Sequence, residues 1–166
     1  MVPPDDDAPE PRPPTVADLV SLCRDLNEAG ARYVVIGGMA IVQAGFTRTT
    51  EDIDLIVDTT PENIACLRVA LMRLPDGAIR EMADADLDEY VVVRVADEIV
   101  VDLMKRACGV EYEEAGRMVD HVTIDGVTIP FANVDLLWKT KQTLRDRDLA
   151  DRAFLGAIRA RRSGDS

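Results

Sequence analysis

The chain has 166 residues, which is long enough for one domain with a buried core and short for two. It is 47% hydrophobic and 30% charged, as is usual for a globular protein, and it lacks the run of roughly 18 apolar residues that a membrane span needs. The first residues are acidic and proline-rich, so we expect no secretory signal, no membrane partner and a cytoplasmic location.

Cysteine and histidine are too few and too dispersed to suggest a zinc site. Cys23, Cys66 and Cys108 lie far apart in the chain, and His121 is the sole histidine. With no Cys-x-x-Cys or Cys/His spacing, a zinc site or a disulfide framework is not expected. Cys23 and Cys66 fall on apolar faces of predicted helices, where they are expected to be small buried hydrophobic residues.

The net charge of −12 is unevenly distributed. Residues 139–162 hold eight Lys/Arg against three Asp/Glu, whereas the preceding part of the chain is strongly acidic. Two interpretations stay open. The basic segment could bind a polyanion such as RNA, or it could complement the acidic body within the fold or a dimer.

The predicted elements begin after a Pro/Asp-rich segment, residues 1–14, that we expect to be disordered. Thr15 is the expected N-cap of the first helix, and Pro61 stands at the first position of a later one. In chain order we expect a helix at 15–30, a strand at 32–36, a short helix at 39–44, a strand at 53–57 and a helix at 60–74.

The second half predicts two hairpins and two helices. The hairpins comprise residues 90–104, turning near Asp97, and residues 121–129, turning at Asp125-Gly126; helices follow at 133–144 and 147–161. This order indicates an α/β (α+β) domain over residues 15–162, with a mixed sheet flanked by helices and a C-terminal helix pair, 133–162, packed on it.

The segment VVIGGMAIVQAGFTRTTEDIDLIV, residues 34–57, contains the most informative polar pattern. The strand ends in Gly37-Gly38, where glycine lets the backbone approach a ligand and the next helix offers free N–H groups to phosphate. Asp52 and Asp54 are separated by one residue at a strand start, so their side chains share a face and lie about 6–7 Å apart. Such carboxylates repel unless they are solvated or share a cation, for which Mg²⁺ is suitable.

A third carboxylate, Asp102, lies in the apolar run 100–104, where burial without a partner is costly. A cation shared with Asp52 and Asp54 would supply that partner. Two plainer interpretations stay open: the first pair caps a loop, and Asp102 is a solvated residue at a sheet edge. The acidic run 81–89 also has Asp-x-Asp spacing, but it follows no glycine turn and is expected to be a solvated loop.

Together these residues resemble the nucleotidyltransferase (polymerase-beta-like) superfamily. Its signature is a hydrophobic residue, Gly-Gly or Gly-Ser, a spacer and then Asp-hydrophobic-Asp/Glu-hydrophobic, with a third carboxylate on a later strand. Here Ile36, Gly37 and Gly38 precede a spacer of thirteen residues and Asp52-Ile53-Asp54-Leu55, and Asp102 follows later.

The resemblance is greatest to small bacterial stand-alone members of the branch linked to abortive-infection and toxin–antitoxin systems. The segment RTTEDID, residues 48–54, is similar to that branch's R-x-T-x-D-h-D pattern. The segments DLLWKTK, residues 135–141, and RDRDLAD, residues 145–151, resemble its helix pair, although Arg147 stands where the branch more often has Lys. Either Lys139 or Lys141 could be the expected lysine.

The resemblance implies an enzyme that moves a nucleoside monophosphate from an NTP to an acceptor hydroxyl on a protein, an RNA or a small molecule. Asp52, Asp54 and Asp102 would hold two Mg²⁺ ions, or Mn²⁺ in their place. Gly37 and Gly38 would contact phosphates, with Lys141 (or Lys139), Arg145 and Arg48 neutralising their charge.

Plainer roles also stay open for the C-terminal side chains. The cations could form the solvated face of a helix, Asp148 and Asp151 are expected to make local ion pairs, and Trp138 is expected to pack. The alternative function is a nucleotide- or partner-binding module with little catalysis, such as one that holds a cognate toxin or antitoxin. A phosphohydrolase with Asp52 as nucleophile is disfavoured, because Leu55-Ile56 follow Asp54 in place of the required motif.

Overall fold

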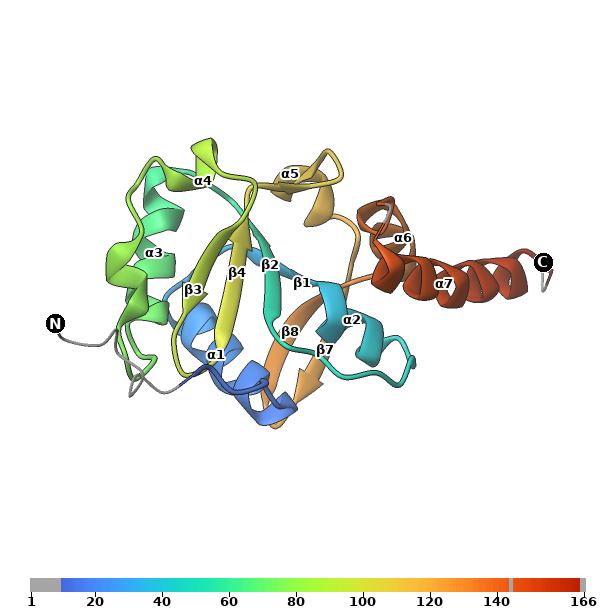
Figure 1. Ribbon diagram of the computed structural model, residues 1–166, viewed down its shortest axis with the longest axis horizontal. Helices are drawn as coiled ribbons and strands as arrows, with labels where there is room; N and C mark the ends of the chain where they lie inside the picture. Colours follow the sequence, from blue (N-terminus) through green and yellow to red (C-terminus); the bar gives the residue numbers. More distant parts are fainter. Residues whose placement is uncertain (1–9, 144, 165–166) are drawn as a thin grey trace, which may run out of the picture.

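The structure is a computed structural model, and it describes residues 10–143 and 145–164 (Figure 1). Its strands are β1 (Tyr33–Ile36), β2 (Ile53–Val57), β3 (Val93–Ala96), β4 (Val100–Met104), β5 (Arg106–Ala107), β6 (Val110–Glu111), β7 (Val119–Ile124) and β8 (Val127–Ala132). Its helices are α1 (Val16–Glu28), α2 (Gly37–Gln43), α3 (Pro61–Leu71), α4 (Asp86–Glu89), α5 (Tyr112–Ala115), α6 (Val134–Thr140) and α7 (Asp146–Gly164), with a 3₁₀ turn at Ala78–Glu81.

A mixed sheet forms the centre of the fold, with the strand order β3-β4-β2-β1-β8-β7. β1 is antiparallel to β2 and parallel to β8, while β2 and β4 are parallel. β3 and β4 form the first predicted hairpin, and β7 and β8 form the second. The expected α/β fold with a mixed sheet flanked by helices is confirmed.

One row of directly paired residues crosses four strands of this sheet: Ile36, Asp54, Asp102 and Arg94. Paired residues on neighbouring strands project to the same face of a sheet. The neighbouring positions Ile53, Leu55, Val101 and Leu103 are fully buried on the opposite face. The alternation along β2 and β4 therefore places two of the predicted carboxylates side by side.

The two long N-terminal helices begin as their sequences predict. The Thr15 side chain accepts a hydrogen bond from the Asp18 N–H, and the Asp18 carboxylate accepts one from the Thr15 N–H, which completes a capping box. Thr60 caps α3, with Pro61 at its start. α1 and α3 pack against each other, and α1 also contacts β8, so their apolar faces join the core.

The C-terminal helices differ from the prediction in one boundary. Asn133 caps α6, but the helix ends at Thr140 rather than extending to Leu144, which lies outside the described residues. The helix does not continue beyond Lys141, its C-cap residue, and the Lys141 side chain lies in a buried ion pair. α7 then packs on α6 and projects away from the sheet (Figure 1).

The acidic run 81–89 is less exposed than predicted. It includes the end of the 3₁₀ turn and all of α4, and its apolar residues Met82 and Leu87 are buried in the core. These two side chains anchor the run, while its carboxylates face outward. The solvated-loop interpretation is therefore wrong for the backbone of this segment.

The described part of the N-terminal segment, residues 10–14, lies against the body. The Arg12 N–H donates to the Glu98 carbonyl at 2.9 Å, and its guanidinium pairs with Asp18 and Glu98. Residues 1–9 of the predicted tail lie outside the described residues. No helix within the described residues is both long enough and apolar enough to cross a membrane.

Candidate active site

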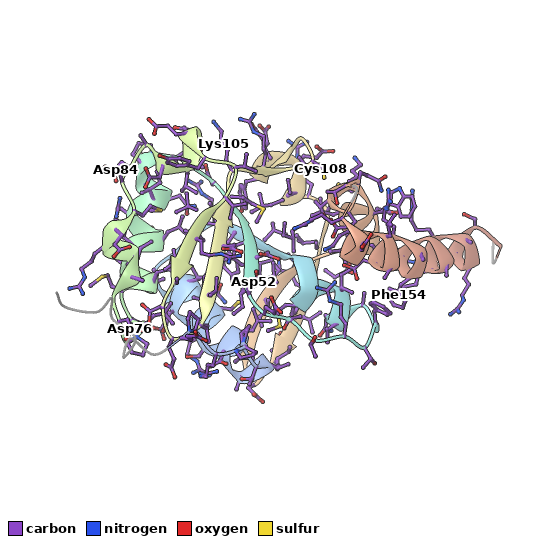
Figure 2. The ribbon with its side chains drawn as sticks, viewed as in Figure 1. Asp52, Asp76, Asp84, Lys105, Cys108 and Phe154 are labelled. Atoms are coloured by element: carbon purple, nitrogen blue, oxygen red, sulfur yellow. The ribbon has the colours of Figure 1, made fainter. Side chains whose placement is uncertain are left out.

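The three predicted carboxylates meet where the start of β2 lies beside the middle of β4. One carboxylate oxygen from each of Asp52, Asp54 and Asp102 lies within 4.8 Å of the other two. Asp102 is buried within β4, while Asp52 and Asp54 are partly buried. Figure 2 shows Asp52 near the middle of the view, beside the sheet. The interpretation of Asp102 as a solvated edge residue is wrong, since β4 lies inside the sheet.

The surroundings of the Asp54 carboxyl disfavour its negative charge. Burial, followed by the negative charges of Asp52 and Asp102, raises the pKa of Asp54 to about 7. The structure shows no hydrogen bond to its carboxylate from any described residue. A partly buried carboxylate beside two others is a group that a bound cation would stabilise.

The two glycines have defined steric roles at this site. Gly37 has a φ of +66°, and a Cβ at this position would lie 2.1 Å from Asp54 Oδ2. A Cβ at Gly38 would lie 2.5 Å from Thr50 Cγ2. Both positions therefore lack room for a side chain, and Gly37 allows the β1–α2 turn to contact Asp54 directly.

Arg94, which the sequence analysis did not identify, completes the row of paired residues. Its Nε and Nη2 each lie 3.0 Å from an Asp102 carboxylate oxygen, and Nη2 lies 3.4 Å from Asp52 Oδ2. The hydrogen bonds to Asp102 are the main cause that raises the pKa of Arg94. The only signal in the sequence was one arginine in a β-branched run, which does not reveal its cross-strand partner.

Lys141 forms a buried ion-pair network that joins α6 to α7. Its Nζ lies 3.1 Å from Asp148 Oδ1 and 3.1 Å from Asp151 Oδ2, and all three side chains are buried. Arg48 Nη1 reaches the same Asp151 oxygen at 2.5 Å, while Arg145 pairs with Asp148 at 3.0 Å. The predicted local ion pairs of the two aspartates are present.

This network keeps the Asp148 carboxylate charged. Burial alone would raise the pKa of Asp148, but hydrogen bonds from Thr143 and Lys141 and the lysine's charge outweigh it, so the pKa is lowered. The other oxygen of Asp151, Oδ1, is buried, and no hydrogen-bond partner for it is found in the described structure.

Lys139 lies outside the cleft. It pairs with Glu114 at 2.8 Å, and about half of its side chain is exposed. Of the two lysines, Lys141 is therefore the one that lines the cleft of the three aspartates. Trp138 packs near Gly156, with the Arg159 guanidinium 5.0 Å from its ring centre.

These groups surround one cleft with a volume of about 1060 Å³. Its lining includes all eight predicted site residues: Gly37, Gly38, Arg48, Asp52, Asp54, Asp102, Lys141 and Arg145. Carboxylates and cations both line this cleft. Such a lining suits a ligand that carries its own negative charge and can share a divalent ion with the carboxylates.

The donor set fits a hard divalent cation. Three carboxylates supply oxygen ligands alone, and they form the one group of three or more acidic, Cys or His side chains with ligand spacing in the described part of the chain. The raised pKa of Asp54, which burial and the two neighbouring carboxylates cause, is consistent with an ion at this place. Zinc is disfavoured, because no histidine or cysteine belongs to the group.

Comparison with known proteins finds similarity in structure but none in sequence. The sequence matches no protein-family model and no curated protein. The fold is similar to the crystal structure, at 1.87 Å resolution, of a "putative nucleotidyltransferase" from Thermotoga maritima, with a TM-score of 0.53. The similarity covers 90% of this chain and 88% of that chain at 15% sequence identity. The chain has a nucleotidyltransferase fold.

Within this nucleotidyltransferase fold, four cations of the basic segment pair with carboxylates. Lys139 and Arg159 pair with Glu114 and Asp135 of the acidic body, whereas Lys141 and Arg145 pair with Asp148 inside the segment. The first two contacts favour the interpretation that the segment complements the acidic body.

Proposed function

We propose that the protein is a nucleotidyltransferase that uses Mg²⁺ or Mn²⁺ to move a nucleoside monophosphate from an NTP to an acceptor hydroxyl. The observation that carries the proposal is the cluster of Asp52, Asp54 and Asp102 in a cleft that Lys141 and Arg145 also line. The nucleotidyltransferase fold is consistent with this chemistry, although a fold alone does not define a reaction.

Different residues of the cleft would bind the phosphates and the divalent ions. Gly37 and Gly38 line the cleft at the start of α2, where their backbone N–H groups would contact phosphate oxygens, and Lys141, Arg145 and Arg48 would lower the cost of bringing a polyanion into the cleft. Asp52, Asp54 and Asp102 would hold two divalent ions. When bound, such ions neutralise charge on the transferred phosphate and lower the pKa of a nearby hydroxyl.

The reaction exchanges one phosphorus–oxygen bond for another. The acceptor oxygen bonds to the α-phosphorus, the bond from that phosphorus to the bridging oxygen breaks, and pyrophosphate leaves. Asp102 would take the proton that the acceptor hydroxyl gives up. Divalent ions held by Asp52, Asp54 and Asp102 would stabilise the negative charge that develops on the leaving oxygen.

The direct test uses α-³²P-labelled NTPs with Mg²⁺ or Mn²⁺, and three acceptors: the protein itself, total RNA and a protein-free extract of small molecules. Label should appear in one acceptor class with wild type and fall at least about 100-fold in Asp54→Asn, because a metal ligand is lost. Asp120→Asn, an exposed carboxylate on β7 outside the cleft lining, should match wild type.

The same assay separates the alternative function. If NTPs bind but no acceptor is labelled, the cleft is a nucleotide-binding module with little or no catalysis. If a partner protein restores labelling, the toxin–antitoxin context is supported.

RNA remains a candidate acceptor in the proposal, because Arg161 and Arg162 are exposed at the far end of α7. Their joint replacement by alanine should weaken RNA binding and reduce its salt dependence. Gel-shift titrations at two salt concentrations measure both effects, and unchanged binding would remove RNA from the proposal.

A further inference from the structure

Arg94 occupies the mouth of the carboxylate triad. Both oxygens of Asp102 accept hydrogen bonds from its guanidinium at 3.0 Å, and Asp52 Oδ2 lies 3.4 Å from the same group. A divalent ion bound by Asp102 and Asp52 would be coordinated by the same carboxylate oxygens that now accept hydrogen bonds from this arginine. The arginine and the ion are therefore competitors for the same carboxylates.

The guanidinium of Arg94 compensates part of the negative charge of the three aspartates. One oxygen from each of the three carboxylates lies within 4.8 Å of the other two, and without a nearby cation their mutual repulsion would destabilise the pairing of β2 with β4. Arg94 places one positive charge against two of them. Asp54 stays outside this contact, so Arg94 compensates the cluster only in part.

The two members of the main contact differ in freedom to move. The Asp102 side chain is 6% exposed and lies within the sheet, whereas the Arg94 side chain is 61% exposed on the edge strand β3. A second pocket of about 330 Å³, lined in part by Pro11, Pro13 and Val100, also borders Arg94. The guanidinium can therefore leave the carboxylates and find space without any change in the core.

We propose that Arg94 is the internal counter-ion of the triad, holding Asp102 and Asp52 in the ion-free protein and giving way when a divalent ion binds. This inference rests on the proposed function, because it takes the triad to be a metal site. The free energy of the arginine contacts is subtracted from that of ion binding, so Arg94 sets the ion concentration at which the site fills.

The test measures binding of Mn²⁺ alone, from the electron paramagnetic resonance signal of the free ion. Arg94→Gln should bind Mn²⁺ about tenfold more tightly than wild type, since the ion no longer breaks a charge-assisted hydrogen-bond pair. Arg94→Lys keeps the charge without the two-pronged geometry and should fall between them. Arg106→Gln is the control: Arg106 lines the same cleft, pairs with Glu111 instead, and should leave the affinity within about twofold of wild type.

Thermal unfolding supplies a second readout that needs no activity. In EDTA, Arg94→Gln should unfold at a lower temperature than wild type, because Asp102 stays buried without its counter-ion. Saturating Mn²⁺ should remove that difference.

Equal or weaker Mn²⁺ binding by Arg94→Gln, with wild type binding normally, overturns the inference and leaves the proposed function intact. Absence of Mn²⁺ binding in both proteins overturns the two together.

Discussion

The carboxylate row illustrates how single positions determine this site. Asp54 and Asp102 are neighbours because β2 and β4 are paired in parallel, and Gly37 contacts Asp54 because no Cβ intervenes. The identities of the three aspartates could be predicted from their spacing and their apolar surroundings. Arg94 could not, because its role depends on the register of β3 against β4, which a single arginine in an apolar run does not encode.

Removing the Asp54 charge should stabilise the ion-free protein at high pH. Its folded pKa, about 7, lies above the ordinary value of 3.8, so the folded state retains a proton that the unfolded chain has lost. Stability should therefore fall as pH rises from about 4 to about 7. Asp54→Asn should unfold at a higher temperature than wild type at pH 8 in EDTA, with the difference disappearing near pH 4. A constant difference across this range would contradict the assignment.

The effect of the close contact between Gly37 and Asp54 can be measured separately from the effect of the positive φ of Gly37. Gly37→Ala and Gly126→Ala both place alanine at a positive φ, which costs about 1–2 kcal/mol. Only Gly37→Ala also forces the Asp54 carboxylate to move, since Gly126 has no atoms near its Cβ position. Urea unfolding should show the larger loss for Gly37→Ala, and Mn²⁺ binding should fall in that variant alone. Equal effects of the two substitutions would rule out this packing role.

At the scale of elements, the strongest local sequence signals correctly predicted helix starts and a hairpin turn. Caps at Thr15, Thr60 and Asn133 are present, and the Asp125-Gly126 turn joins β7 to β8. The end of α6 was predicted too late, because the residues that follow Thr140 contain no strong helix breaker. The buried ion pairs of Lys141 stop that helix, and such tertiary contacts are not visible in local sequence.

The junction between α6 and α7 should depend on Lys141 and hardly on Lys139. Lys141→Met leaves two buried carboxylates with less compensation and should lower the free energy of unfolding by about 3–5 kcal/mol. Lys139→Met removes an exposed pair with Glu114 and should change it by less than about 1 kcal/mol. Denaturant titration of both variants provides the comparison. Similar losses in the two would show that the buried network is not what stabilises the junction.

At the scale of the whole molecule, the mixed sheet and its flanking helices followed from the order of the elements, but the strand order did not. Parallel pairing of β1 with β8 joins segments nearly a hundred positions apart, and no local pattern specifies that contact. The charge asymmetry was visible in the sequence, yet only the structure shows that four of the C-terminal cations pair with carboxylates.

The most direct test of the central claim is calorimetric titration of the protein with each NTP, with and without Mg²⁺, beside the Asp52→Ala/Asp54→Ala double variant. The proposed function predicts that wild type binds at least one NTP only when Mg²⁺ is present, and that the variant does not bind it under either condition. Equal binding by wild type and the variant, or no binding by wild type to any NTP, would contradict a metal-assisted nucleotide site in this cleft.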